Sequence, residues 1–201
     1  FADVAADTLE YVRRDLTHPE GGFYSAEDAD SVPPEQASEP SPHKREGAFY
    51  VWRDEEIGAA LGADADFFRL RFGVLPGGNA PFDPQHEFTH QNLLYTARAI
   101  DDIASMTGSP SDAIGAAVVR ARATLLDIRS RRPRPHLDDK VLTAWNGLMI
   151  AGFARAGRTL ERGDKYVATA RSAASFIRTR LWNPEDRTLL RRFRDGDAGV
   201  E

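Results

Sequence analysis

The sequence VLTAWNGLMIAGFARAGRTL, residues 141–160, predicts a helix that is apolar on nearly every side. The segment that follows, DKYVATARSAASFIRTRL at residues 164–181, predicts a helix with one apolar face and with arginines on the other. A helix that is apolar all round is enclosed by other elements, whereas an amphipathic helix lies on the outside of a fold. Alternating enclosed and outer helices indicate helical hairpins arranged in a ring or in layers.

Further helices are predicted where apolar residues recur with helical spacing and where Pro, Gly or an acidic cap marks an end. They are expected at residues 1–16, 54–61, 65–72, 92–107 and 111–131. We expect Asp54 to cap the helix that starts there, and Asp138 or Asp139 to cap the helix at 141–160. The remaining segments predict a surface loop at 31–44, a short strand at 48–53 and a long ordered loop at 75–91.

A weak internal repeat supports an array of hairpins. The pattern Tyr11-Val12-Arg13, Leu16, Pro19-Glu20 recurs at the same spacing as Phe176-Ile177-Arg178, Leu181, Pro184-Glu185. Each copy ends an outer-type helix and enters a predicted hairpin. Repeated helical hairpins are typical of toroids and solenoids, and a chance match of two amphipathic helices is the alternative.

The composition excludes several classes of protein. Of the 201 residues, 41% are hydrophobic and 28% charged, a composition typical of globular proteins. A chain of this length can bury one hydrophobic core. A net charge of −5 gives no electrostatic footprint for nucleic acid, so no nucleic-acid partner is expected. Without cysteine there is no disulfide, thiolate metal site or cysteine nucleophile.

The sequence also bears on the cellular location and the extent of the chain. Its apolar runs are too short to cross a bilayer, so no membrane partner is expected. No signal peptide is visible, and we expect a cytoplasmic protein. Phe1 has no Met before it and falls within a helical pattern, so we expect the chain to be a fragment of a longer protein.

Three carboxylates follow two aromatic residues in the run GGFYSAEDADS, residues 21–31. Glu27, Asp28 and Asp30 are candidates for a general acid or base, because carboxylates grouped in a concave site can divide these roles between them. The alternative is a solvated turn in which Asp28 or Asp30 caps the local backbone.

A second polar group consists of Asp138-Asp139-Lys140 followed by Trp145-Asn146. Asn146 falls on an apolar helix face and therefore needs hydrogen-bond partners. It could line a polar cavity in which Trp145 offers a flat apolar surface to a sugar ring. In the alternative, Asp138 caps the helix and Asn146 bonds a neighbouring backbone segment.

A third group, Glu46, Tyr50 and Trp52, alternates along the predicted strand. Alternate residues of a strand point to the same side, so these side chains would form one surface. An aromatic core strand with a carboxylate at its edge is the alternative.

The sequence HEFTH at residues 86–90 matches the H-E-x-x-H pattern of zinc peptidases. That motif needs a helix, where residues four apart share a face and reach one metal ion. Pro81 and Pro84 precede it here, and no Glu follows Glu87 until Glu161. We therefore disfavour a zinc metallopeptidase, expect no metal and interpret the segment as a polar loop.

Four segments identify a family resemblance. They are residues 21–31, the sequence EGAFYVW at 46–52, Asp83-Pro84 with Glu87 and residues 91–94, and DDKVLTAWNGLMI at 138–150. These segments closely resemble the thioredoxin-domain proteins typified by spermatogenesis-associated protein 20. That family has Gly where this chain has His86 and His90, whereas Glu87 and Asn92 match its pattern. The resemblance implies that the two histidines are local replacements rather than ligands.

The resemblance implies a thioredoxin-like domain followed by a six-hairpin (α/α)6 barrel similar to N-acylglucosamine 2-epimerases, cellobiose epimerases and related glycosidases. The chain would be one all-α domain, residues 1–201, with short β-hairpins in its loops. It would form about the first half of the barrel and would lack the thioredoxin-like part. We expect such a half barrel to associate with itself, or to be loosely ordered near Glu201.

The implied reaction is the epimerisation or isomerisation of a sugar by proton abstraction and return, or the hydrolysis of a glycoside. The candidate catalytic residues are Glu27, Asp28, Asp30, Glu46, Glu87, Asp138 and Asp139. The candidate substrate-binding residues are Tyr24, Tyr50, Trp52, Asn92, Lys140, Trp145 and Asn146. The expected partner is a small molecule, with a sugar as the leading candidate, and no cofactor is expected. The alternative is a non-catalytic binding or structural barrel attached to a redox domain, with the same side chains consumed in internal contacts.

Overall fold

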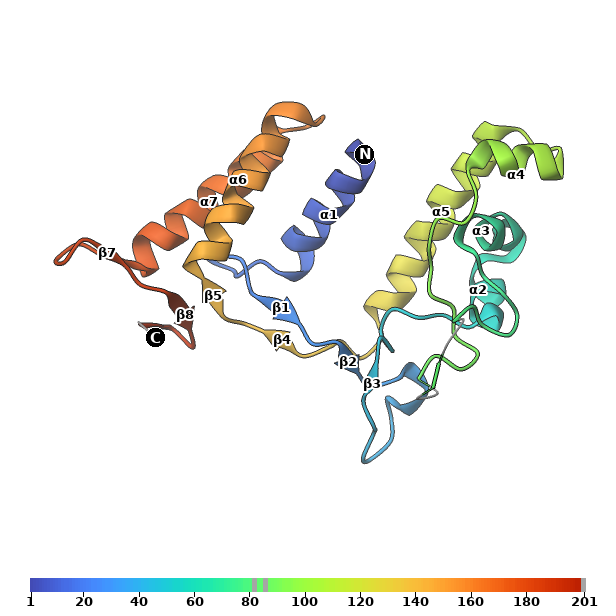
Figure 1. Cartoon of the computed structure of the whole chain (residues 1–201), viewed down its shortest axis with the longest axis horizontal. Coiled ribbons are helices and arrows are strands. Elements are labelled where there is room, and N and C mark those ends of the chain that lie inside the picture. Colours follow the sequence, from blue (N-terminus) through green and yellow to red (C-terminus); the bar gives the residue numbers. More distant parts are fainter. Residues whose placement is uncertain (81–82, 85–86, 200–201) are drawn as a thin grey trace. The chain divides into compact units, whose positions relative to one another are not determined.

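The computed structural model describes residues 1–80, 83–84 and 87–199 (Figure 1). The chain divides into two compact units. Unit 1 comprises Phe1–Asp28 and Leu137–Glu201, and unit 2 comprises Ala29–His136. The described chain is mostly helical with a few short strands, as predicted.

Unit 1 is built around a pair of packed helices, α6 (Thr143–Thr159) and α7 (Asp164–Arg180), with α1 (Ala2–Asp15) against α6 (Figure 1). Its first core contains Phe23 and Phe153, whose rings stack with their centroids 5.2 Å apart. A second core consists of Val141, Phe176, Leu181 and Phe193.

Short strands complete unit 1, and some of them form β-hairpins of the kind predicted for the loops. Two ladders have two strands each and one has three, in the order β5-β8-β9; all are antiparallel. Their strands are β1 (Ala26–Glu27) with β4 (Leu137–Asp138), β6 (Trp182–Asn183) with β7 (Thr188–Leu189), and β5 (Val141–Leu142) with β8 (Arg192–Arg194) and β9 (Asp197–Gly199).

The described part of unit 2 contains four helices and one strand pair. The helices are α2 (Asp54–Leu61), α3 (Ala65–Phe72), α4 (Ile100–Thr107) and α5 (Ser111–Ser130), with 3-10 turns η1 (Pro34–Gln36) and η2 (Gly62–Asp64). Strand β2 (Asp30–Ser31) pairs with β3 (Arg45–Glu46). Trp52, Ile57, Phe68 and Leu125 form the main core, where α2 and α3 pack on α5.

The helices predicted at 1–16, 54–61, 65–72, 111–131 and 164–181 are confirmed to within about a residue. The helix predicted at 92–107 begins only at Ile100. Its first residues are extended because their backbone is bonded elsewhere: the N–H groups of Tyr95 and Ala97 donate to Phe72 O and Arg71 O, at 3.4 and 2.9 Å.

The strand predicted at 48–53 is wrong. Gly47 has a φ of 67° and starts a turn, in which the N–H of Tyr50 donates to Gly47 O at 2.8 Å. As a result Tyr50 is exposed and Trp52 is buried, so these two side chains do not form one surface with Glu46.

The predicted caps are also wrong. Asp54 is the first helical residue, and its carboxylate accepts from Arg69 Nε at 2.6 Å instead of capping. Residues 141–142 form strand β5, so α6 starts at Thr143 with Leu142 at the cap position and no side-chain cap. Asp138 lies in β4, and Asp139 contacts Arg194.

Helix α6 is not enclosed within the described chain. Trp145 and Leu148 are 57% and 76% exposed, and only Asn146, Phe153 and Ala156 of the helix are buried. Helix α7 is one-sided as predicted. Its helical spacing places Ala174 on the inward face, but Ala174 is exposed and Ala173 is buried instead. Among the described residues, no helix is both long and apolar enough to span a bilayer.

Candidate functional site

The run at residues 21–31 begins with two glycines that lie directly against α7. Gly21 has a φ of 112°, and a Cβ at this position would lie 2.9 Å from the backbone of Ser172. A Cβ at Gly22 would lie 2.8 Å from the ring of Phe176. The glycines therefore permit a close approach that places Phe23 in the core of unit 1.

Asn146 holds this run in place. Its Oδ1 accepts from the N–H of Phe23 at 2.8 Å, and its Nδ2 donates to Phe23 O at 2.9 Å and to Leu142 O at 3.0 Å. The side chain is 1% exposed, and both of its amide hydrogens are used. This is the alternative interpretation, in which Asn146 bonds neighbouring backbone.

Asn92 has the same role in unit 2. Its Oδ1 accepts from the N–H of Leu75 at 2.8 Å, and its Nδ2 donates to Leu75 O and Trp52 O at 3.1 and 3.3 Å. Trp52 is buried, and the guanidinium of Arg132 lies 3.8 Å from the centre of its ring. Asn92 and Trp52 thus contribute to the structure of unit 2 and present no surface to solvent.

The carboxylates of unit 1 contact hydroxyl or cationic groups. Glu27 Oε2 accepts from the hydroxyl of Tyr11 at 2.9 Å. Lys140 Nζ lies 3.1 Å from Asp138 Oδ2, in a pair whose side chains are each 35% exposed. Asp28 follows β1 and is exposed.

Asp139 pairs with the last arginine of β8. Arg194 Nε lies 2.8 Å from Asp139 Oδ1, but the two groups are not aligned for a hydrogen bond. Burial and the negative charge of Asp139 raise the pKa of Tyr24 above its ordinary value. Tyr24 and Asp139, both named from the sequence, therefore interact.

Strands β2 and β3 bring two other candidates together in unit 2. Asp30 lies directly opposite Glu46 in the register, and both residues are exposed. Side chains that are opposite on an antiparallel pair share a face, with Cβ atoms about 4.5–5.5 Å apart. Two like charges in this position repel each other across the ladder.

Glu87 lies in a loop organised by Asp83. The carboxylate of Asp83 accepts from the N–H groups of Glu87 and Phe88 at 2.8 and 3.0 Å. Residues 87–90 form bends and turns, and His90 has a φ of 59°. His86 lies outside the described residues. The described part of HEFTH is thus not helical, and the described residues contain no group of three or more metal-binding side chains.

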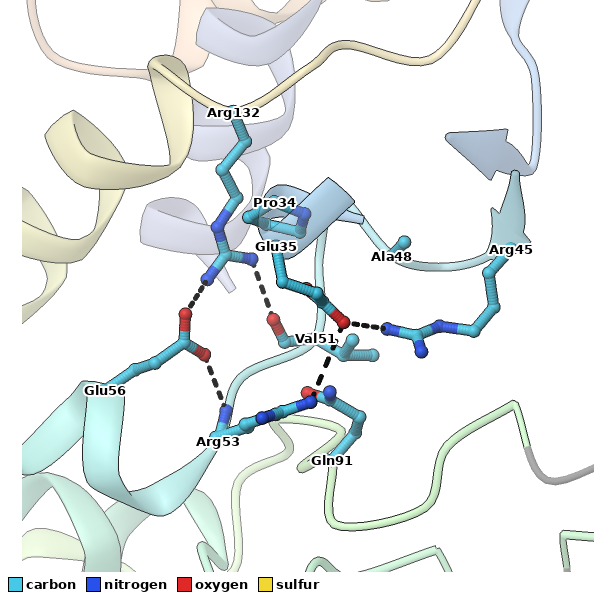
Figure 2. Close-up of a pocket in the computed structure, with 9 residues that line it drawn as sticks. All are labelled: Pro34, Glu35, Arg45, Ala48, Val51, Arg53, Glu56, Gln91 and Arg132. Carbon is cyan, nitrogen blue, oxygen red and sulfur yellow. Dashed lines mark hydrogen bonds and ion pairs between the residues drawn. The ribbon is translucent and has the colours of Figure 1, made fainter. Parts of the chain in front are cut away.

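Each unit has a hollow of its own. In unit 1 an open hollow of about 440 Å³ is lined by Trp145, Leu142, Leu189 and neighbouring residues. In unit 2 a hollow of about 230 Å³ is lined by Arg45, Arg53 and Arg132 with Glu35 and Glu56 (Figure 2). We call the second hollow the arginine pocket.

The arginines of this pocket are not among the candidates named from the sequence, which were carboxylates, aromatic residues, two asparagines and a lysine. A signal was present, since Arg45 and Arg53 flank the run EGAFYVW on both sides. Arg132 could not be found in this way, because it reaches the pocket from the far end of α5.

Comparison with known proteins finds several relatives of the chain. No family model matches it. Over its whole length it is 37% identical to spermatogenesis-associated protein 20 of Mus musculus and 36% identical to that of Homo sapiens. Over 87% of its length it is 34% identical to an uncharacterized protein of Caenorhabditis elegans. The chain spans about a quarter of these relatives, 26% of the mammalian proteins and 24% of the nematode protein.

Proposed function

We propose that the chain is part of a carbohydrate-active domain that epimerises or isomerises a sugar, or hydrolyses a glycoside, with carboxylates as acid and base. One observation carries this proposal: Asp30 and Glu46 are exposed and directly opposite each other on β2 and β3. Such proton transfers require an acid and a base within reach of the substrate, and a pair of carboxylates can supply both.

The chemistry needs one carboxylate that accepts a proton and one that donates it. Asp30 and Glu46 fill these two roles, in an order that the substrate decides. Tyr50 follows β3 in the same unit and is 39% exposed, and the part of its ring that Phe49 and Arg129 leave uncovered can contact the face of a sugar. The choice of a sugar rests on the resemblance to thioredoxin-domain proteins with a six-hairpin barrel.

Unit 1 offers a second set of groups. Asp138 and Asp139 are part-exposed, and Trp145 is exposed beside the hollow that it lines with Leu189. An exposed indole above an apolar hollow is suited to stacking against a pyranose ring. We propose that these residues form a separate sugar-binding site within unit 1.

A non-catalytic binding or structural barrel is the second candidate, and a different observation favours it. The amides of Asn92 and Asn146 are fully used by backbone groups, and Glu27 accepts from Tyr11. Several side chains with the expected chemistry are therefore consumed in internal contacts.

The deciding experiment is a screen of mono- and disaccharides for binding by NMR and for turnover, with exchange of sugar hydrogen for deuterium as the readout of epimerisation. We expect Asp30→Asn and Glu46→Gln each to lower turnover by about 100-fold or more and to leave the fold intact. Asp139→Asn tests unit 1 in the same assay.

Glu39→Gln is the matched control, because Glu39 is an exposed carboxylate of the loop between β2 and β3. Turnover that survives both Asp30→Asn and Glu46→Gln would rule out the proposed acid and base. If no sugar is bound or turned over, the proposed activity is ruled out and the non-catalytic barrel is favoured.

A further inference from the structure

The arginine pocket has a rigid base formed by Arg132. The side chain of Arg132 is 5% exposed, and its Nη1 donates to Phe49 O at 3.1 Å and to Val51 O at 2.8 Å. Its guanidinium also lies over the ring of Trp52. These contacts fix a buried cation beside the pocket, and burial lowers the pKa of Arg132 from its usual value.

Arg45 and Arg53 bring two further cations to the pocket, and both approach the same carboxylate. Oε1 of Glu35 lies 3.4 Å from Arg45 Nη2 and 3.6 Å from Arg53 Nη2 (Figure 2). These contacts are longer than a well-formed ion pair, in which nitrogen and oxygen lie about 2.7–2.9 Å apart. Glu35 is thus held loosely between two guanidinium groups.

The Nε of Arg45 is an unusual group in this pocket. It is buried, and it has no hydrogen-bond acceptor among the residues that the structure describes. A buried donor without an acceptor costs free energy, and native proteins rarely retain one without a reason. A ligand oxygen bound at Arg45 would give this donor the acceptor that it lacks among the described residues.

The charges of the lining residues point to an anion. Three guanidinium groups face two carboxylates, and Glu56 is already bonded to the N–H of Arg53 at 2.9 Å. The volume of about 230 Å³ exceeds what one water molecule requires. Guanidinium groups bind phosphate oxygens through pairs of parallel hydrogen bonds, which suits several arginines around one small site.

We infer that the arginine pocket is a binding site for a phosphate group, either free or as the monoester of a small molecule. Arg45 and Arg53 hold the phosphate, Arg132 supplies fixed positive charge, and Glu35 is the internal competitor that the phosphate displaces. This site lies wholly in unit 2 and is independent of the sugar chemistry proposed above.

Calorimetric titration of the chain with inorganic phosphate at low ionic strength tests the site. We expect saturable binding that weakens as salt is added. Arg45→Gln and Arg53→Gln should each weaken it by about tenfold or more, because each removes a charged hydrogen-bond donor. Glu35→Gln should strengthen it, because the competing carboxylate is gone.

Arg131→Gln is the matched control. It changes the net charge by the same amount, but Arg131 is exposed, does not line the pocket and pairs with Asp127. Parallel titrations with glucose 6-phosphate and acetate distinguish a monoester from free phosphate and from a carboxylate ligand.

Two results would overturn the inference: no saturable phosphate binding by the unaltered chain and by Glu35→Gln, or an equal loss in Arg131→Gln and the pocket variants. Tighter binding of acetate than of either phosphate would also overturn it. If Arg45→Gln unfolds, as circular dichroism would show, Arg53→Gln decides, because the side chain of Arg53 is 48% exposed and tolerates replacement.

Discussion

Asn92 and Asn146 show how one side-chain amide can make the two hydrogen bonds that a loop residue would otherwise make with a neighbouring strand. A primary amide has the same donor and acceptor as a peptide group, and each asparagine pairs with both backbone groups of one loop residue. Asn146 pairs with Phe23, and Asn92 pairs with Leu75. The loops thereby acquire fixed positions inside the two units without belonging to a sheet.

Replacement of Asn146 by Ala should therefore destabilise unit 1. The N–H and the carbonyl oxygen of Phe23 would lose their partners in a buried place, which costs about 2–4 kcal/mol of unfolding free energy. Urea denaturation measures the change. Asn183→Ala is the control, because its hydrogen bonds to Asp186 and Glu185 are exposed and its effect should be small. Equal effects of the two variants would contradict this role of Asn146.

At the scale of elements, the helices were predictable because their signals are local. Gly73 and Gly108, in left-handed conformation, end α3 and α4 directly after the periodic segment. The strands were not predictable, because most have two residues and β1 and β5 find their partners far along the sequence. Asp195-Gly196 is an exception: both residues have positive φ, and this pair is a recognisable hairpin turn that the sequence analysis passed over.

The same contrast holds for the candidate site. The sequence indicates that Asn146 needs partners, but not that Phe23 and Leu142 provide them. It places Asp30 and Glu46 in separate runs, and only the β2–β3 register brings them opposite each other. The type of a residue predicts which contacts its side chain can make. Which residue it contacts depends on how distant segments of the chain pack together.

The internal repeat has a counterpart in the backbone. After α1, the N–H of Tyr24 donates to Leu16 O at 2.9 Å, and after α7 the N–H of Leu190 donates to Leu181 O at 2.7 Å. The second connection is one residue longer than the first, but each brings the chain back to the residue that ends its helix. This agreement favours a repeated structural unit over a chance match.

Helix α1 is linked to α7 by an ion pair whose strength should depend on pH. Lys165 Nζ lies 2.5 Å from Glu10 Oε1, and Arg13 bonds the other oxygen at 2.8 Å. Burial alone would raise the pKa of Glu10, but Lys165 and Arg13 outweigh it and lower that pKa. A carboxyl with a lowered pKa stabilises the fold above its ordinary pKa, and this stabilisation is lost as the pH falls through the lowered value.

Glu10→Gln should therefore reduce the loss of stability between neutral and acid pH, as measured by urea midpoints at a series of pH values. The effect should be small, because both side chains are more than one-third exposed. Glu161→Gln is the control, since Glu161 is an exposed carboxylate in the same unit. A pH dependence that is identical in Glu10→Gln and in the unaltered chain would contradict the link.

At the scale of the whole molecule, unit 2 is an insertion in the sequence of unit 1. Ala26 of β1 pairs with Asp138 of β4, so the chain leaves unit 1 and returns to it on adjacent strands. Unit 2 has its own core around Trp52 and Phe68, which draws on residues of unit 2 alone. These are the properties of a segment that can fold by itself.

A fragment of residues 29–136 should therefore fold when it is produced alone. We expect a helical circular dichroism spectrum and a cooperative thermal transition. A fragment of residues 54–136 is the control: it lacks Trp52 and the backbone acceptors of Arg132, and it should lose the cooperative transition. A gradual, non-cooperative transition of the longer fragment would show that its core depends on unit 1.

The packing of α1 has a consequence for the order of events on the ribosome. This helix is synthesised before every other helix of the chain, but Val12 packs against Phe153 and Tyr166, which are translated only after all of unit 2. Unit 2 can complete its core while the ribosome is still at work. The first helix of the chain to emerge is thus among the last to be ordered, and in the interval its apolar face is open to chaperones.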